Sequence, residues 1–287
     1  MTTVLEGQVV AKAVWTETTK KIEQFKKTFR KTPQLAVISI GDDPASKIYL
    51  ANKEKACQEV GILFQRHELE KTNHPEALDQ LLNRLNADAD INGILVQLPM
   101  PPAFKVERVF EVLNPLKDVD GFHPENLGLL LSGRPRVKPC TPFGIMKMLE
   151  HYGIPVEGKT AVVVGRSNIV GKPMSQLLTN ANATVIQCHS KTSDLQKWTR
   201  MGDIVVVAAG KPYLLGADAF KKGAVVLDVG IHRTAENKLI GDVNPAGLKD
   251  HVAAYSPVPG GVGKMTVAML VQNLADLAFM QQSHRLI

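Results

Sequence analysis

The sequence predicts an α/β protein of two domains, the second of them a Rossmann-like, doubly wound parallel sheet. Short apolar runs alternate with helical segments along all 287 residues, and 44% hydrophobic content is enough for two cores. Four apolar runs in the second half recur about every 20 residues, the spacing of a doubly wound nucleotide-binding domain. We therefore expect residues 1–140 together with 265–287 to form one domain, and 141–264 the other.

In the first half, β-rich apolar runs alternate with stretches whose apolar residues recur at helical spacing. This βαβαβ rhythm predicts a parallel sheet. Ser46 is expected to cap the second helix and Gly61 to end it. The predicted elements are a helix over 10–29, a strand over 35–40 followed by a turn cluster at 41–44, a helix over 46–61, a strand near 62–67, a helix from 75 and a strand over 93–98.

The second half opens after a stretch, 114–140, that we expect to be rich in loops. Thr141-Pro142 then begins a helix, with proline at its first position. A largely apolar helix over 265–279 closes the chain. The four strands predicted between these helices are 160–164, 184–188, 204–208 and 225–229.

Composition narrows the class of protein. The three cysteines are far apart and odd in number, which predicts a reducing compartment, the cytoplasm, rather than a disulfide framework. No apolar run reaches the roughly 18 to 20 residues of a membrane span, and residues 1–12 lack a signal peptide's features. The net charge is +6, but basic residues are interleaved with acids. This favours small anionic ligands over nucleic acid. The scattered histidines predict no metal site.

One strand-to-helix turn has the features of a nucleotide site. Gly165 would permit a tight turn after a strand, and Gly171 would let the next helix pack against that strand. Ser167 takes the place of the middle glycine of the usual G-x-G-x-x-G fingerprint, and the loop is one residue longer. Amides at the helix start can bind a phosphate. The alternative is an ordinary turn with no ligand.

The end of the next strand indicates which dinucleotide binds. NAD enzymes usually place an acid there for the ribose hydroxyls. This sequence instead continues 188–192 as Cys-His-Ser-Lys-Thr, with no acid. Ser190, Lys191 and Arg166 suit a 2′-phosphate, so NADP is expected rather than NAD. The alternative for Lys191 is a solvated surface lysine.

Polar residues near predicted strand ends form a candidate site in the first half. Tyr49 and Lys53 are four residues apart on one predicted helix and so share a face. Gln97 ends a predicted strand, and Asp118 and Asp120 lie in a loop. Open α/β sheets bind ligands at such strand ends. Each residue also has a plainer interpretation: a surface lysine, a packing ring, a strand-end cap, or an aspartate turn.

Together, these segments closely resemble the bifunctional methylenetetrahydrofolate dehydrogenase/methenyltetrahydrofolate cyclohydrolase family. Eight matching stretches run in order along essentially the whole chain. They are Gly41-Asp42-Asp43-Pro44-Ala45-Ser46-Lys47-Ile48-Tyr49 through Lys53, Gly93-Ile94-Leu95-Val96-Gln97-Leu98-Pro99, Lys117-Asp118-Val119-Asp120-Gly121-Phe122, Pro139-Cys140-Thr141-Pro142, Val164-Gly165-Arg166-Ser167 through Val170-Gly171-Lys172-Pro173, Asp228-Val229-Gly230-Ile231, Gly241-Asp242-Val243, and Pro257-Val258-Pro259-Gly260-Gly261-Val262-Gly263.

The resemblance implies NADP-dependent oxidation of methylenetetrahydrofolate to methenyltetrahydrofolate, followed by hydrolysis to formyltetrahydrofolate in one-carbon metabolism. It identifies Lys53 as the catalytic lysine and Tyr49 as the ring that stacks on the folate. Gln97 corresponds to the lysine's hydrogen-bonding partner, and Asp120 to the carboxylate that grips the pterin. Hydride transfer needs mainly positioning, whereas adding water needs proton transfer, for which a partly desolvated lysine is suited.

The resemblance also assigns the rest of the site. The first domain would bind folate and the second NADP, with the active-site cleft between them, and the subunit would form a homodimer. Pro259 and Gly261 resemble part of the substrate wall. The residues that resemble cofactor contacts are Gly165, Arg166, Ser167, Ser190 and Ile231.

Three residues depart from the family pattern. Lys264 stands where proline is usual, Leu129 where a basic residue is frequent, and His232 where asparagine often follows Gly-Ile. Two other functions are alternatives: a monofunctional dehydrogenase of the same family, and a non-catalytic NADP-binding regulatory protein. The intact first-half set, Tyr49 with Lys53 and Gln97, favours both activities.

Overall fold

The computed structural model describes residues 1–41, 44–72 and 74–283, so Asp42 and Asp43 of the expected turn cluster lie outside the described residues. The chain forms two compact units. The six-stranded unit comprises Met1–Lys12 and Pro139–Thr266, and the three-stranded unit comprises Ala13–Lys138 and Val267–Ile287. Two of the three boundaries between the units fall within helices, one in α1 (Gly7–Phe29) and one in α9 (Val262–Ser283), and the third lies between Lys138 and Pro139.

The first twelve residues belong to the six-stranded unit, whereas the sequence-based division grouped them with the other domain. The reason is a two-residue strand, β1 (Thr3–Val4), which pairs in parallel with β11 (Ala254–Tyr255) near the end of the chain. Such a short strand carries too little periodicity to be recognised in the sequence.

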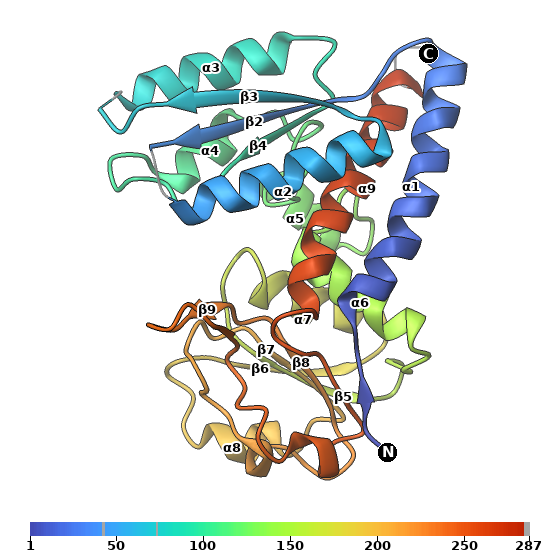
Figure 1. Ribbon diagram of the computed structural model, residues 1–287, viewed down its shortest axis with the longest axis vertical. Coiled ribbons are helices and arrows are strands. Elements are labelled where there is room, and N and C mark those ends of the chain that lie inside the picture. The colour runs from blue at the N-terminus through green and yellow to red at the C-terminus, as the bar shows by residue number, and fades with distance from the viewer. Residues whose placement is uncertain (42–43, 73, 284–287) are drawn as a thin grey trace. The chain divides into compact units, whose positions relative to one another are not determined.

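The six-stranded unit contains a fully parallel sheet. The central, valine-rich strands are buried along most of their length, as expected for a sheet covered on both faces. Figure 1 shows α7 (Gly171–Asn180) and α8 (Leu195–Thr199) on opposite sides of this sheet, which is the doubly wound arrangement. The strand order is β1, β11, β8 (Val225–Asp228), β7 (Ile204–Val207), β5 (Thr160–Val164) and β6 (Thr184–Cys188).

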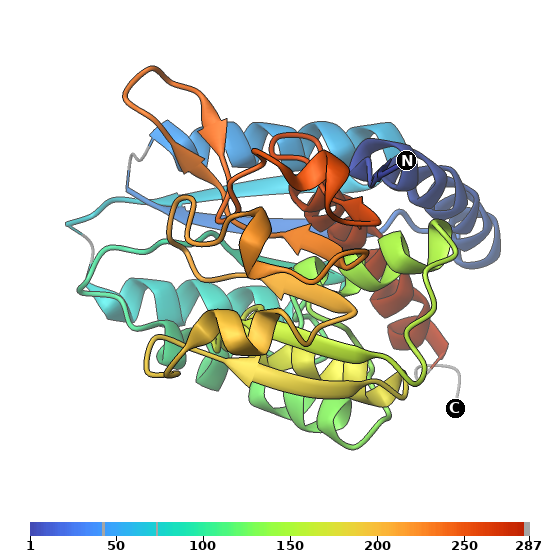
Figure 2. The ribbon, with the colours of Figure 1, turned by 90° about the horizontal axis from the view of Figure 1, so that it is seen from below.

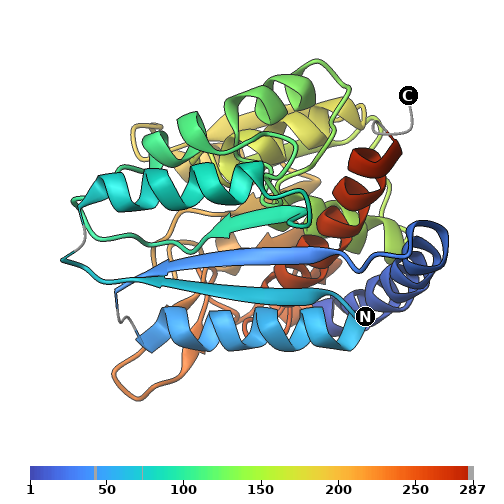
Figure 3. The same ribbon diagram turned by 90° about the horizontal axis from the view of Figure 1, so that it is seen from above.

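The three-stranded unit holds a smaller parallel sheet. Its strand order is β3 (Leu63–Leu69), β2 (Gln34–Ile40) and β4 (Gly93–Val96). Apolar residues on one face of β2 and β4 pack against α3 (Pro75–Ala87) and α4 (Val106–Val112). In Figure 3, α2 (Pro44–Val60) lies on the opposite side of these strands from α3.

Several elements differ from the sequence-based expectation. The stretch expected to be loop-rich contains a helix, α5 (Pro124–Leu131), and α2 begins at Pro44 rather than after Ser46. The helix expected to start at Thr141 is α6 (Cys140–His151), so Pro142 lies within its first turn. A hairpin of β9 (His232–Arg233) and β10 (Leu239–Ile240), orange in Figure 2, was not predicted. Short 3-10 turns occur at Ala217–Ala219 and Leu248–Asp250. None of the described helices is long and apolar enough to cross a membrane.

Two buried aspartates organise the loops at the carboxyl ends of β7 and β8. Asp228 accepts hydrogen bonds from the backbone amides of Gly230, Asp242 and Val243. Burial raises the pKa of the Asp228 carboxyl to about 6. The three amides act in the opposite direction and lower this pKa, whereas the nearby charge of Asp242 raises it further. Gly241 lies so close to this carboxylate that a Cβ there would overlap Asp228 Oδ2.

This close approach predicts that Gly241→Ala destabilises the protein. The added methyl group must displace a buried carboxylate that holds three amides, at a cost of about 1–3 kcal/mol. Thermal unfolding followed by circular dichroism should show a melting temperature lowered by roughly 2–10 °C. The control is Gly128→Ala, because a Cβ on Gly128 in α5 would meet no atom within 4 Å. Equal melting temperatures for the two variants would contradict the interpretation.

Candidate active site

The predicted lysine–glutamine pair is present in the three-stranded unit. Lys53 Nζ donates a hydrogen bond of 2.8 Å to Gln97 Oε1. Gln97 follows β4, and its own backbone amide bonds to Ile38 O on β2, so the sheet fixes its position. Gln97 Nε2 donates to Leu98 O, which orients the amide with its oxygen toward the lysine. The lysine is thus held over the carboxyl end of the sheet.

Tyr49 lies one helical turn before Lys53 on α2, and 43% of its surface is exposed. A partly exposed ring one turn from a lysine can stack on a flat ligand that the lysine also reaches. Cys57, one turn further along the helix, is fully buried. Burial raises the pKa of its thiol to about 12, so Cys57 packs as a neutral group and does not act as a nucleophile.

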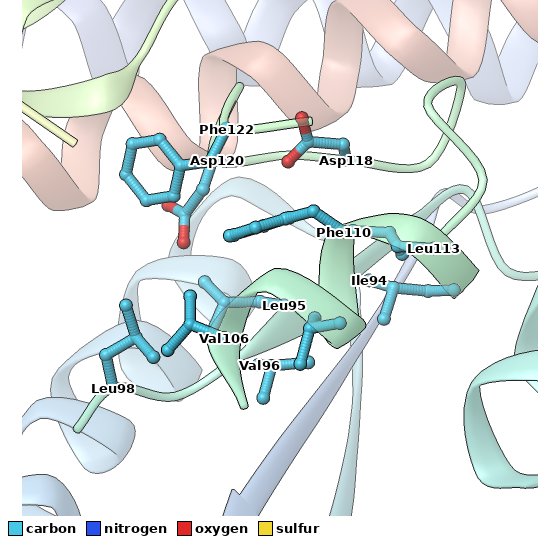
Figure 4. Close-up of a pocket in the computed structure, with 11 residues that line it drawn as sticks. Ile94, Leu95, Val96, Leu98, Val106, Phe110, Leu113, Asp118, Asp120 and Phe122 are labelled. Atoms are coloured by element: carbon cyan, nitrogen blue, oxygen red, sulfur yellow. The ribbon is translucent and has the colours of Figure 1, made fainter. Parts of the chain in front are cut away.

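Asp120 is presented by a loop that runs beside β4. Ile94 N donates to Lys117 O, and Asp118 forms a parallel bridge with Ile94. Figure 4 shows Asp118 and Asp120 on this loop, with the Phe122 ring beside Asp120. The side chains lining this region enclose only about 10 Å³, space for a single water molecule at most. They therefore form a packed wall that carries the half-buried Asp120 carboxylate.

The neighbouring Asp118 has a different role from Asp120. Its buried carboxylate accepts the amides of Gly121 and His123 and the side-chain amide of Asn126, which closes the loop around Asp120. Asn126 is fully buried on α5, where the sequence had indicated only loop. Lys117 is also buried and donates to Leu85 O and to a carbonyl at the end of α3. Sequence reasoning assigned no role to Asn126 or Lys117, although Lys117 begins one of the stretches that match the family.

In the six-stranded unit, the turn after β5 has the geometry of a phosphate-binding turn. Gly165 adopts a φ of +144°, and a Cβ on Gly171 would overlap Gly165 O, so both glycines are required. Ser167 Oγ accepts the amides of Val170 and Gly171 at the start of α7. Since that oxygen accepts two hydrogen bonds, its own proton is available for an anionic ligand on the exposed side.

Arg166 and Ser190 lie at the ends of neighbouring strands. Val164 of β5 pairs with Cys188 of β6. Arg166 follows Val164 by two residues, and Ser190 follows Cys188 by two residues. Gln187 Nε2 also donates to Gly165 O, which ties the two strand ends together. Arg166, whose side chain is exposed, therefore lies in a turn adjacent to the turn that carries Ser190.

The turn after β6 contains no carboxylate. His189 N donates to Thr192 Oγ1 and Lys191 N to His189 Nδ1, so the segment closes on itself and leaves Lys191 exposed. The first acid after β6 is Asp194, a residue that sequence reasoning did not consider. Asp194 caps α8 by accepting Lys197 N. This strand end therefore offers cations and hydroxyls to a ligand.

The remaining predicted residues also lie in the six-stranded unit. Ile231 follows β8 and is 43% exposed. Pro259 and Gly261 follow β11, where Gly261 N bonds to Pro257 O and starts α9. Of the three departures from the family pattern, Lys264 lies in the first turn of α9, and its amide bonds to Gly261 O. Leu129 lies on α5, and His232 begins β9.

No group of three or more metal-binding side chains comes together within residues 1–41, 44–72 and 74–283. The arrangement can position a lysine and a carboxylate toward an organic ligand in the three-stranded unit. In the six-stranded unit, it can bind an anionic dinucleotide at the carboxyl ends of the strands.

Comparison with known families identifies both halves of the chain. Residues 5–120 match the tetrahydrofolate dehydrogenase/cyclohydrolase catalytic domain. Residues 139–282 match the NAD(P)-binding domain of the same family.

Individual relatives agree with these matches. Bifunctional protein FolD of Bdellovibrio bacteriovorus is 49% identical over 279 residues, which cover 97% of each chain. The crystal structure of the bifunctional FolD enzyme of Campylobacter jejuni matches with a TM-score of 0.95 and 43% identity, over 98% of this chain and 99% of that one. The Trypanosoma brucei enzyme, solved with NADP and an inhibitor, matches with a TM-score of 0.93 and 35% identity, over 99% of each chain. The chain belongs to the tetrahydrofolate dehydrogenase/cyclohydrolase family.

Proposed function

We propose that this chain oxidises methylenetetrahydrofolate to methenyltetrahydrofolate with NADP and hydrolyses the product to formyltetrahydrofolate. The observation that carries the proposal is the hydrogen bond between Lys53 and Gln97, with Tyr49 one turn away, in a chain that matches both domains of the family. Bound NADP would supply the hydride acceptor. The direct test is to incubate the protein with methylenetetrahydrofolate and NADP, and to follow the appearance and decay of methenyl absorbance.

The two steps make different demands on the protein. Hydride leaves the methylene carbon directly, so the oxidation depends on holding two ligands in the right orientation. Hydration of the methenyl cation requires a proton to be taken from water. Lys53 is suited to this step because Gln97 fixes the direction of its Nζ atom. Asp120 is suited to bind the pterin, because a carboxylate accepts from an amino group and a ring N–H together.

The residues around the dinucleotide site fit NADP. Arg166, Ser190 and Lys191 are all exposed, and the first acid after β6 in the sequence, Asp194, is engaged as a helix cap. A 2′-phosphate carries negative charge that these side chains can bind, whereas the ribose hydroxyls of NAD would find no carboxylate acceptor in the turn.

The two alternative functions make distinct predictions. A monofunctional dehydrogenase would need no lysine held for proton transfer, and a regulatory NADP-binding protein would need no site in the three-stranded unit. The Lys53–Gln97 contact therefore favours a bifunctional enzyme over both. We also propose a cytoplasmic location, because all three cysteines are buried and none is bridged to another.

The role of Lys53 predicts a selective loss of hydration. Lys53→Met keeps much of the side-chain bulk and removes the titratable group. It should lower cyclohydrolase activity by on the order of 100-fold or more, the scale of a general base. Dehydrogenase activity should fall less steeply. The matched control is Lys55→Met on the same helix, because Lys55 is an exposed lysine near Glu59. Parallel assays of both steps measure the difference. Near wild-type hydration by Lys53→Met would refute the assignment.

The proposed NADP site predicts cofactor-specific loss of affinity. Arg166→Ala removes a charged donor to the 2′-phosphate and should weaken NADP binding by on the order of tenfold or more. The Michaelis constant for NAD should change much less. Lys222→Ala, which removes one exposed charge just before β8, controls for net charge. Equal losses for both cofactors, or a wild-type preference for NAD, would count against this assignment.

We further propose that the chain forms a homodimer, as its family resemblance implies. Sedimentation velocity at micromolar concentration should then give a species of about twice the 31.3 kDa chain mass. A single species at the mass of one chain would rule the dimer out.

A further inference from the structure

His232 makes a buried contact that the proposed chemistry does not use. Its Nε2 atom lies 2.7 Å from Asp242 Oδ1, and Asp242 is 0% exposed. A carboxylate only accepts hydrogen bonds, so the imidazole donates. His232 is also the residue that stands where asparagine often occurs in the family pattern. Asparagine is shorter, and its Nδ2 atom would lie where the histidine has Nδ1, so the contact through Nε2 is specific to the longer side chain.

The carboxylate of Asp242 joins two neighbouring strand ends. Besides the contact with His232, it accepts the amides of Ala209, Gly210 and Lys211 in the loop after β7. Its own backbone amide donates to Asp228 at the end of β8. Dinucleotides bind at the carboxyl ends of the strands in sheets of this kind. Asp242 therefore connects two loops on the edge where the cofactor is proposed to bind.

Ile231 lies between two of these anchors. The preceding residue, Gly230, donates its amide to Asp228 Oδ1, and the following residue, His232, is bound through its ring to Asp242. His232 also pairs with Ile240 in the hairpin of β9 and β10. Ile231 itself is exposed and held on both sides, so its position depends on these contacts.

We propose that His232 is a positioning residue for NADP. Its hydrogen bond to Asp242 fixes Ile231 and the loop after β7 in the geometry that binds the dinucleotide. This proposal rests on the proposed function, in which Ile231 contacts the cofactor. His232 takes part in no chemical step. Its removal should therefore weaken the affinity for NADP and leave hydration of the methenyl group unchanged.

The experiment is a titration of NADP into the full-length protein, read by intrinsic fluorescence or calorimetry. His232→Leu removes the donor and should weaken NADP binding by on the order of tenfold, the scale of a lost hydrogen bond to a charged group. His232→Gln keeps a donor at the position of Nε2 and should bind within about twofold of wild type. Cyclohydrolase activity, which consumes no NADP, should be unchanged in both variants. If His232→Leu fails to fold, His232→Phe, which also lacks the donor, takes its place in the titration.

The matched control is His251→Leu. His251 is a second histidine of the same unit whose Nε2 atom bonds, at 2.7 Å, to Phe220 O before β8. It should lower the melting temperature without altering the affinity for NADP. Equal affinity in His232→Leu and wild type, failure of His232→Gln to bind as wild type does, or equal weakening in His251→Leu would each overturn the proposal. Absence of NADP binding by the wild-type protein would instead refute the proposed function.

Discussion

Buried carboxylates that accept backbone amides hold the ligand-binding edge of the six-stranded sheet together. Where a parallel strand ends, the amides of the following loop lose their ladder partners and need other acceptors. Asp228 takes three such amides and Asp242 takes three more from a different loop. These bonds leave the backbone little freedom where the cofactor is expected to bind. Gly230 and Gly241 complete the arrangement, because a Cβ on either would overlap one of the two aspartates.

The three-stranded unit uses the same principle on a smaller scale. Asp118 gathers the amides of its own loop, and Asn126 reinforces it from α5. Lys117 performs the complementary task by donating to carbonyls at the end of α3. Residues proposed to meet ligands, such as Asp120, thus lie on segments whose backbone is fixed by other side chains. Holding reactive groups in place before a ligand arrives is the contribution that hydride transfer requires most.

The sequence was most informative where local pattern and tertiary structure agree. The strands over 160–164 and 184–188 were predicted residue for residue, because β-branched runs between turn residues have few other solutions. The hydrogen bond between Lys53 and Gln97 was expected from the family resemblance, whereas strand-end reasoning alone had only grouped the two residues in one candidate site. The helix α5 was missed because the glycine within it and the prolines around it are typical of a loop. The partnership of Asp228 with Asp242 joins residues fourteen positions apart through a fold that no local pattern encodes.

The turn after β6 has a consequence for how this fold changes its cofactor in evolution. His189 and Thr192 close that turn through backbone amides and their own side chains, independently of the side chains of Ser190 and Lys191. The side chains of the two residues between them therefore contribute little to the stability of the turn. Exchanging these side chains should cost little folding stability, so a dinucleotide preference that depends on them, as proposed, is separable from the backbone architecture of the site. Under that proposal, a lineage could change its dinucleotide preference by altering a few exposed side chains while its sheet stays the same.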